Sequence, residues 1–387
     1  MRLGDCGKTN LHTYSDKEKW SLIRYLDTGS ITEGRIDEIQ TLYPGVDKIP
    51  SRARRKASVG DILFSTVRPN QKHYGIIEAG TENLLVSTGF TVVTVDTTIV
   101  DPYFIYYYLT QSSVIESLQA IAEQSTSTYP SIKPSDIEDI ELDLPELETQ
   151  KKIGSTLRML DRKIALNEEI NDNLYAQAKA IFDNHFINID AIPAGWRKGN
   201  LLDIANYLNG LAMQKFRPQG HEIGLPVLKI KELRQGSCDD SSELCSLSIK
   251  PEYIIHNGDV VFSWSGSLLV DIWCGGTCGL NQHLFKVTSD VYDKWFYYLW
   301  TAHHLARFIA IAADKATTMG HIKREELAKA EVLIPCEEDY TSFNSIMQPI
   351  FELIISNRIE SRKLAALRDE LLPKLMTGEI DVSDVQP

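Results

Sequence analysis

Residues Gly60-Asp61-Ile62-Leu63-Phe64-Ser65 occur again further along the chain as Gly258-Asp259-Val260-Val261-Phe262-Ser263. Shorter matches follow both segments in the same order and at an almost constant spacing. They pair Tyr107-Tyr108-Leu109 with Tyr297-Tyr298-Leu299, Ile132-Lys133 with Ile322-Lys323, Pro145 with Pro335, and Asn167 with Asn357. A constant spacing over so long a stretch indicates an internal repeat. The 387-residue chain is therefore predicted to hold two copies of one unit, at about 1–186 and 187–387.

Each copy is predicted to begin with a region of mixed helix and strand. Short runs rich in β-branched and aromatic residues, bounded by Gly, Pro and Asn, predict strands. They include Asp61–Ser65, Phe90–Val95 and Val260–Ser263. An aromatic-rich stretch in each copy, at 102–123 and 292–313, predicts a helix. The fold class expected for the chain is therefore α+β, with two pseudo-repeated mixed domains.

Each copy is predicted to end in a long helix, at 146–186 and at 336–377. Apolar side chains recur there at alternating spacings of four and three residues, which is a heptad seam. The seam positions are Ile153, Leu157, Leu160, Ile164, Asn167, Asn171 and Leu174 in the first helix, and Met347, Ile350, Ile354, Asn357, Leu364 and Leu371 in the second. Because a lone helix does not bury its own seam, we expect the two helices to pack on each other as a coiled coil whose asparagines set the register.

Three features of these helices stay open. The seam alone does not decide whether the helices run parallel or antiparallel. Pro349 either kinks the second helix or marks its true first turn. The alternative to a coiled coil is that each helix packs on a separate domain and that the polar seam positions are solvated.

Several segments resemble the specificity subunits of type I restriction–modification systems. They include 127–144, with its Ile132-Lys133-Pro134-Ser135-Asp136-Ile137 run, the stretch 144–153 that leads into the first long helix, and Thr317–Lys323 with Leu333-Ile334-Pro335. The ending Leu367–Ile380 is the strongest match. Glu338-Asp339-Tyr340 departs from the family, in which a Gln-containing segment is usual at this place.

The resemblance implies a layout and a function. The helices would form an antiparallel coiled coil between two target-recognition domains, at 1–145 and 187–335, with a C-terminal tail at 378–387. Each recognition domain would read one half of a bipartite site on double-stranded DNA. The helices would set the distance between the halves and bind two modification (methyltransferase) subunits, which restriction (endonuclease/translocase) subunits join. The chain itself would have no catalytic activity.

The net charge of −13 argues against a simple basic DNA-binding protein, but the charge is unevenly distributed. Residues 48–77 hold seven Lys or Arg side chains against one acid, Asp61. Two groups of residues in this stretch are candidates for DNA contact. We expect phosphate contacts from Arg52, Arg54, Arg55 and Lys56. We expect base reading from Arg68, Asn70, Gln71, Lys72 and His73, since Arg, Asn and Gln bond well to guanine and adenine edges. The alternative is an ordinary solvated surface loop.

The candidates in the second unit are fewer. Lys229 and Lys231 are expected on one face of a strand, Trp264 follows the repeated strand, and Gln282 and His283 precede another. Thr318 and His321 stand ahead of the second long helix, where their polar side chains would reach phosphates. Trp264 is equally well explained as a core residue.

No motif of the sequence predicts catalysis, a cofactor or a metal. Asp101-Pro102-Tyr103-Phe104 lacks the second proline of an adenine methyltransferase motif, and Gly4–Thr9 is too short for a phosphate-binding loop. Cys274 and Cys278, with His283 nearby, are better explained as free thiols than as zinc ligands. Two alternatives remain: a DNA methyltransferase or nuclease with an unrecognised site, and a coiled-coil adaptor without DNA readout.

The remaining expectations concern partners and location. Apolar side chains outside the seam, at Leu166, Ile170, Tyr175, Ile355 and Leu367, predict that the helices bind protein. No apolar run is long enough to span a membrane and no apolar leader is visible, so the chain is expected in the cytoplasm with its six cysteines reduced.

Overall fold

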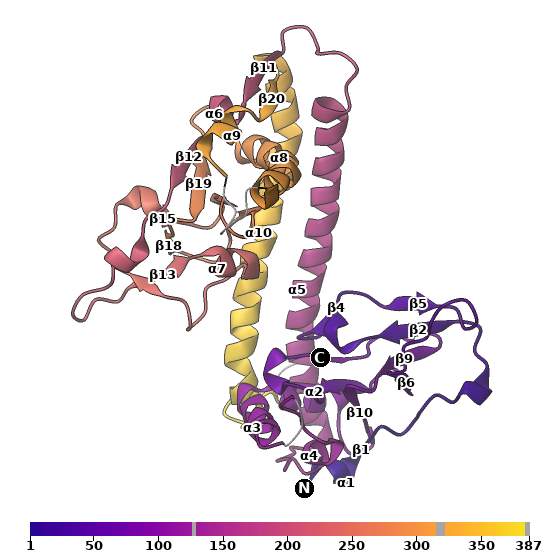
Figure 1. Cartoon of the computed structure of the whole chain (residues 1–387). Helices are drawn as coiled ribbons and strands as arrows, with labels where there is room; N and C mark the ends of the chain where they lie inside the picture. Colours follow the sequence, from indigo (N-terminus) through magenta and orange to yellow (C-terminus); the bar gives the residue numbers. More distant parts are fainter. Residues whose placement is uncertain (126–128, 315–321, 384–387) are drawn as a thin grey trace. The chain divides into compact units, whose positions relative to one another are not determined.

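The computed structural model describes residues 1–125, 129–314 and 322–383. The chain divides into two compact units (Figure 1). Unit 1 comprises Met1–Arg162 and Ala365–Pro387, and unit 2 comprises Lys163–Leu364. Two long helices, α5 (Leu147–Phe182) and α10 (Glu337–Met376), each contribute residues to both units.

Unit 1 contains two four-stranded sheets. The first, in the order β1-β10-β7-β8, is antiparallel, and the second, in the order β5-β2-β9-β6, is mixed because β2 and β9 run parallel. The first sheet consists of β1 (Gly7–Thr9), β10 (Phe90–Val95), β7 (Ile62–Ser65) and β8 (Tyr74–Ile76). The second consists of β5 (Gln40–Leu42), β2 (Ile23–Leu26), β9 (Leu84–Ser87) and β6 (Ala53–Lys56), and β3 (Ile31–Thr32) pairs with β4 (Arg35–Ile36).

The alternation of side chains along the strands explains how the layers of unit 1 pack. In β7, Ile62 and Phe64 pack on the helices, while Leu63 faces a separate cluster shared with the second sheet. The helices are α1 (Leu3–Cys6), α2 (Pro102–Thr110), α3 (Ser112–Glu123) and α4 (Pro134–Glu138). The helical stretch predicted at 102–123 is confirmed but consists of two helices, because Gln111, with φ −59° and ψ 140°, separates α2 from α3.

Unit 2 repeats this topology strand for strand. Its antiparallel sheet has the order β12-β19-β16-β17, and its mixed sheet has the order β14-β13-β18-β15 with β13 parallel to β18. The strands are β12 (Asn206–Asn209), β19 (Leu284–Thr288), β16 (Val260–Ser263), β17 (Leu269–Ile272), β14 (Leu244–Cys245), β13 (Leu225–Leu228), β18 (Cys278–Leu280) and β15 (Ile254–Ile255). A further pair joins β11 (Arg197–Asn200) to β20 (Glu331–Ile334), and the helices are α6 (Leu201–Ile204), α7 (Ile230–Gln235), α8 (Lys294–Asp314) and α9 (Arg324–Ala328). The predicted α+β class with two repeated mixed domains is therefore confirmed.

The repeated hexapeptide forms the same turn and strand in both units. Gly60 and Gly258 both adopt φ +88°, a left-handed conformation that favours glycine. The carboxylate of the next residue accepts a hydrogen bond from the backbone N–H three residues before it. Asp61 accepts from Ser58 at 2.7 Å, and Asp259 accepts from His256 at 2.8 Å. The sequence repeats here because one backbone conformation is needed twice.

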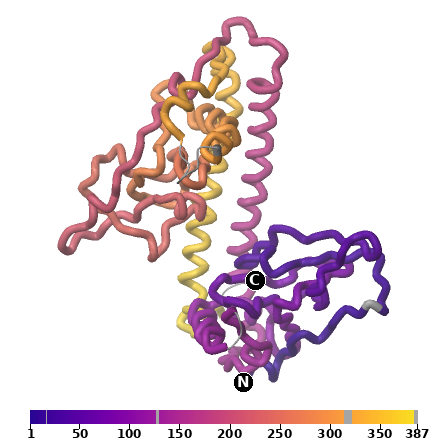
Figure 2. Tube along the Cα trace, viewed as in Figure 1, coloured from indigo at the N-terminus to yellow at the C-terminus, as the bar shows by residue number. Residues whose placement is uncertain are grey.

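The long helices pack on each other in antiparallel orientation within each unit. In unit 1, Ile153 and Leu157 of α5 join the buried cluster that holds Leu372 and Leu375 of α10. In unit 2, Ala178 and the rest of the C-terminal part of α5 share a cluster with the N-terminal part of α10. The polar seam positions are not solvated, since Asn167 and Asn357 are both buried. Figure 2 shows both helices as continuous stretches of the trace, and α10 continues through Pro349, which therefore does not mark its first turn.

Among the described residues, no helix is both long and apolar enough to cross a membrane.

Candidate nucleic-acid interface

The basic run Arg52–Lys56 lies mostly on β6, which is an edge strand of the mixed sheet of unit 1. Arg52 is exposed and Arg54 is half-buried. The Arg55 guanidinium is half-buried and donates hydrogen bonds to Asn10 Oδ1 and to the carbonyl of Phe90, and burial lowers its pKa. Arg55 therefore already has protein partners, whereas Arg52 points to solvent.

Lys56, at the end of the same strand, has two partners from the N-terminal segment. Its ammonium group forms an ion pair with Glu18 and lies 5.1 Å from the centre of the Trp20 ring. The hydrogen bond from Lys56 lowers the pKa of Glu18, so this carboxylate stays ionised at neutral pH. A DNA phosphate would have to displace or neighbour that carboxylate.

The five candidates for base reading lie in the loop after β7, at residues 68–73. Arg68 and Lys72 adopt positive φ, of 50° and 57°, on either side of a short helical turn, Pro69–Gln71. This conformation leaves the side chains of Asn70 and Gln71 exposed at the tip of the loop. The Arg68 guanidinium lies 5.2 Å from the centre of the Tyr129 ring.

The base of this loop is anchored. The Lys72 ammonium lies 2.5 Å from Glu33 Oε1, and His73 Nδ1 lies 2.7 Å from the carbonyl oxygen of Ile31. At the other end of the loop, the backbone N–H of Arg68 donates to the carbonyl of Pro130 at 3.0 Å, so Asn70 and Gln71 are presented on a loop held at both ends, as a direct reader of bases requires.

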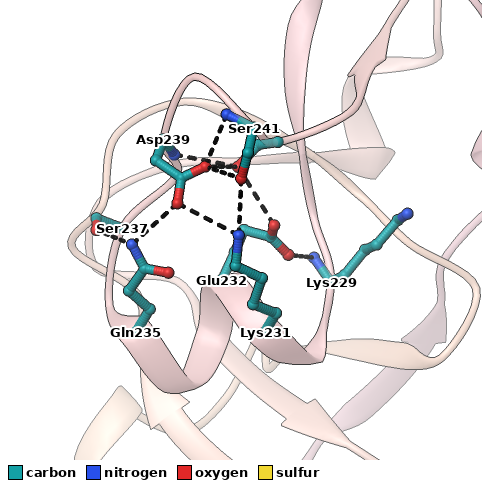
Figure 3. A network of polar contacts seen from close by, with 8 residues as sticks. Lys229, Lys231, Glu232, Gln235, Ser237, Asp239 and Ser241 are labelled. Carbon is teal, nitrogen blue, oxygen red and sulfur yellow. Dashed lines mark hydrogen bonds and ion pairs between the residues drawn. The ribbon is translucent and has the colours of Figure 1, made fainter. Parts of the chain in front are cut away.

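The expectation that Lys229 and Lys231 share a strand face was wrong. Strand β13 ends at Leu228, Lys229 is the N-cap of α7, and Lys231 lies in that helix. The helix begins here because the Glu232 carboxylate accepts the Lys229 backbone N–H at 3.2 Å, and it ends at Gly236, with φ +77°. Both ammonium groups are paired. Lys229 pairs with Glu243, and Lys231 lies 3.3 Å from Asp239, as Figure 3 shows.

Trp264, Gln282 and His283 are brought together in unit 2 at the ends of β16 and β19. Trp264 is half-buried, its indole N–H donates to Asn209 Oδ1 at 2.9 Å, and its ring lies 6.1 Å from that of His283. His283 Nδ1 lies 3.2 Å from Ser265 Oγ, and its Nε2 lies 3.3 Å from the Gln282 amide. Thr318 and His321 lie outside the described residues, so their predicted role has no structural account.

The loops after β7 and β16 are held in the same way. The backbone N–H of Ile132 donates to the carbonyl of Thr66 at 2.8 Å, and that of Ile322 donates to the carbonyl of Trp264 at 2.9 Å. The loop at 66–73 in unit 1 and the loop that starts at Trp264 in unit 2 therefore occupy equivalent places in the repeated fold.

The cysteines give no indication of a metal centre. Cys274 and Cys278 are buried and free, and the thiol of Cys278 has Cys238 as its hydrogen-bonding neighbour. No group of three or more His, Cys, Asp or Glu side chains suited to a metal ion occurs within residues 1–125, 129–314 and 322–383.

Comparison with known proteins finds similar chains of one kind. Residues 53–176 match the family model of the type I restriction modification DNA specificity domain. The chain is 22% identical to the type I restriction enzyme HindI specificity subunit of Haemophilus influenzae, over 98% of both chains. It is 26% identical to the MjaIX specificity subunit of Methanocaldococcus jannaschii, over 84% of this chain and 79% of that protein.

The chain is similar to type I specificity subunits over nearly its whole length. Its fold is shared with the S subunit of the type I restriction–modification system from M. genitalium, with a TM-score of 0.56 and 15% identity over 97% of this chain and 95% of that one. The region of the chain that matches the family model contains β6, the loop at 66–73 and most of α5.

Sequence reasoning missed the acids that pair with the candidate cations of this chain, and it missed one of the cations. Glu18, Glu33, Asp239 and Glu243 each pair with a nominated lysine, and the exposed Arg217 shares Glu243 at 2.5 Å. The partners of an ion pair come from separate segments, so no spacing in the sequence reveals them. Arg217 stands beside Lys215, and this second, shorter basic cluster was the available signal.

Proposed function

We propose that this chain reads a bipartite sequence on double-stranded DNA, one half-site with each recognition domain. The observation that carries the proposal is the strand-for-strand repeat of one mixed domain in a chain whose first copy matches a DNA specificity domain. Two copies of one reading domain suit a target of two separate half-sites. The chain supplies recognition and no catalysis.

The recognition domains are assigned to 1–145 and 187–335, the conserved helices to 146–186 and 336–377, and the tail to 378–387. The loop at 66–73 carries the proposed base contacts of the first domain, with Asn70 and Gln71 exposed at its tip. The second domain has Trp264 at the equivalent place, with Gln282 and His283 beside it. Arg52, Arg54, Lys56, Lys229 and Lys231 are proposed to contact phosphates, which position the protein without reading sequence.

The helices are proposed to bind two modification (methyltransferase) subunits, and restriction subunits are proposed to join that complex. Two of the apolar side chains named from sequence support this, since Leu166 and Leu367 are 49% and 43% exposed. Two others do not, because Tyr175 and Ile355 pack against the buried cluster of unit 2. Met159, Ile346 and Leu353 add further exposed apolar surface on α5 and α10.

The test is to map methylated bases in DNA from cells that express this chain with its modification subunit. We expect a split motif: two short specific blocks around a gap of fixed length and free sequence. A complex that assembles but methylates no motif would contradict DNA readout and favour the adaptor function. A single unbroken motif would contradict the assignment of one half-site to each domain.

A further inference from the structure

The loop between α7 and β14 of unit 2, residues 236–243, carries three acids, Asp239, Asp240 and Glu243. We call it the acidic loop. It lies over cations of its own domain, with the Asp239 carboxylate 3.3 Å from the Lys231 ammonium (Figure 3). Glu243 holds two cations at once: one oxygen pairs with Lys229, and the other lies 2.5 Å from the Arg217 guanidinium.

Hydrogen bonds fix the acidic loop in this position. Asp239 Oδ1 accepts the backbone N–H of Ser241 at 2.9 Å and its hydroxyl at 2.5 Å, and the same hydroxyl lies 2.8 Å from the Lys231 ammonium. The Ser242 hydroxyl donates to Glu232 in α7 at 3.2 Å. The hydrogen bond from Ser241 lowers the pKa of Asp239, so the carboxylate is ionised at neutral pH.

These ion pairs remain open to solvent, and so to a competing anion. The Lys231 side chain is 58% exposed and that of Arg217 is 48% exposed. Exposed ion pairs contribute little to folding stability, so they are exchanged at small cost. A phosphate that approaches these cations meets a carboxylate already beside them and must displace it or lie next to a like charge.

The same pairing occurs in unit 1. Lys56 is paired with Glu18 and Lys72 with Glu33. All four lysines that sequence nominates for DNA contact are thus paired with an acid of their own unit. Unit 2 differs in that its acids come from one short loop, which makes the arrangement open to a local test.

We propose that the acidic loop competes with DNA phosphates for Arg217, Lys229 and Lys231, so that stable binding requires base contacts in addition. This inference rests on the proposed function and adds a control of affinity to it. Phosphate contacts supply nearly all of the affinity for DNA without a target sequence. A built-in competitor lowers that affinity on any duplex, and it leaves base reading unchanged.

The test compares Glu243→Gln with Glu331→Gln in the full chain, in complex with its modification subunits. Glu331 of β20 forms an ion pair with Lys198 at 2.6 Å and is 60% exposed, against 39% for Glu243, and Figure 1 shows β20 far from α7 within unit 2. Both variants remove one negative charge. Affinity is measured over a series of salt concentrations, on a duplex with the mapped methylation motif and on a scrambled duplex.

We expect Glu243→Gln to tighten binding to both duplexes by a similar factor, about three- to tenfold. We also expect the slope of log affinity against log salt to steepen by about one to two, because each added phosphate contact contributes about 0.9. Glu331→Gln should change neither quantity. Equal effects of the two variants, or a gain confined to the motif duplex, would overturn the inference.

A second variant separates release of the cations from a change in net charge. In a Lys229→Gln background, Glu243→Gln frees only Arg217, so the gain should be about half as large on a logarithmic scale. An undiminished gain would overturn the inference. If the parent complex does not prefer the motif duplex, the proposed function fails, while the gain on the scrambled duplex still decides whether the acidic loop competes with phosphates.

Discussion

Asn167 of α5 and Asn357 of α10 occupy equivalent places in the repeat. Each bonds to the residue four positions after the other asparagine, in the opposite helix. The Asn167 amide lies 3.2 Å from Ser361 Oγ, and the Asn357 amide lies 3.0 Å from Asn171 Oδ1. Asn171 and Ser361 are themselves equivalent in the repeat. The two contacts are therefore related by a local pseudo-two-fold axis, as antiparallel packing of two similar helices requires.

This arrangement fixes the register of the helices at some cost. Asn167 Oδ1 is buried and, among the described residues, has no hydrogen-bond partner. A slip by one seam position would bring the asparagines against leucine and isoleucine and leave their amides unpaired as well. Polar seam residues of this kind select one register over better-packed alternatives.

Asn357→Leu should lower the free energy of unfolding by about 1–3 kcal/mol, because it removes the buried Asn357 amide and leaves the half-buried Asn171 carboxamide oxygen without its donor. Asn173→Leu is the matched control, since Asn173 is exposed on α5 and bonds only to the carbonyl of Glu169 in its own helix. The measurement is urea unfolding of the full chain, followed by helical circular dichroism. Equal effects of the two substitutions would show that the buried pair contributes no more than a surface residue.

Gly154 of α5 permits close packing on the first turn of α2 in unit 1. A Cβ atom at this position would lie 2.6 Å from Asp101 Oδ1 and 3.0 Å from the backbone nitrogen of Phe104. Asp101 caps α2 by accepting the Phe104 N–H at 2.9 Å, so neither atom moves without loss of that bond. Gly154→Ala is expected to destabilise the chain by about 1–3 kcal/mol through overpacking.

Gly29→Ala is the control for this substitution. A Cβ at Gly29 meets nothing within 4 Å, and its φ lies outside the left-handed region. Differential scanning calorimetry of the full chain should show a lower melting temperature for Gly154→Ala and little change for Gly29→Ala. Unchanged melting of both variants would show that α5 shifts away from α2 at no cost.

His304 of α8 is expected to make unit 2 sensitive to acid. Burial lowers the pKa of His304 below its ordinary value of 6.5, and its Nε2 lies 2.8 Å from the carbonyl oxygen of Glu331. The unfolded chain binds a proton near pH 6.5 that the folded chain binds only at lower pH. The stability contributed by neutral His304 is therefore present above about pH 6.5 and is lost as the pH falls below it.

The melting temperature of the parent should accordingly drop between about pH 7.5 and pH 5.5, the interval in which an ordinary histidine titrates. His304→Gln keeps a side-chain N–H for the Glu331 carbonyl and removes the titrating group. This variant should lose less stability over the same interval. An equal loss in both proteins would assign the acid sensitivity to other groups, such as His303, whose pKa burial also lowers.

The sequence was sufficient for those features that depend on local pattern. The hexapeptide repeat depends on a glycine with positive φ and a capping aspartate, and the seam depends on heptad spacing, so both are visible in one chain. The break at Gln111 was missed, although the poor helix formers Thr110, Ser112 and Ser113 beside it were an available signal. Lys229 and Lys231 were placed on a strand because the apolar run before them continues without a turn residue, and only the Glu232 cap shows where the helix begins.

The candidate interface was less predictable than the fold. Basic residues can be counted from sequence, but their partners depend on tertiary contacts, as with Arg55 and Phe90 or Lys231 and Asp239. The positions of Asn70 and Gln71 at an exposed loop tip follow from the left-handed conformations of Arg68 and Lys72, which no sequence pattern requires. Charge therefore predicted the region, and the backbone decides which side chains are presented.

The loop at 66–73 allows a direct test of base reading by unit 1. Gln71→Ala removes an exposed amide able to make two hydrogen bonds to one adenine edge, which is worth about 1–3 kcal/mol of discrimination. The expected result is a methylation motif relaxed at one position in one block, with the other block and the gap unchanged. Lys198→Ala, an exposed substitution on β11 of unit 2, should leave both blocks intact. Relaxation of both blocks by Gln71→Ala would show that the effect is general loss of affinity, and an unchanged motif would remove Gln71 from the readers of bases.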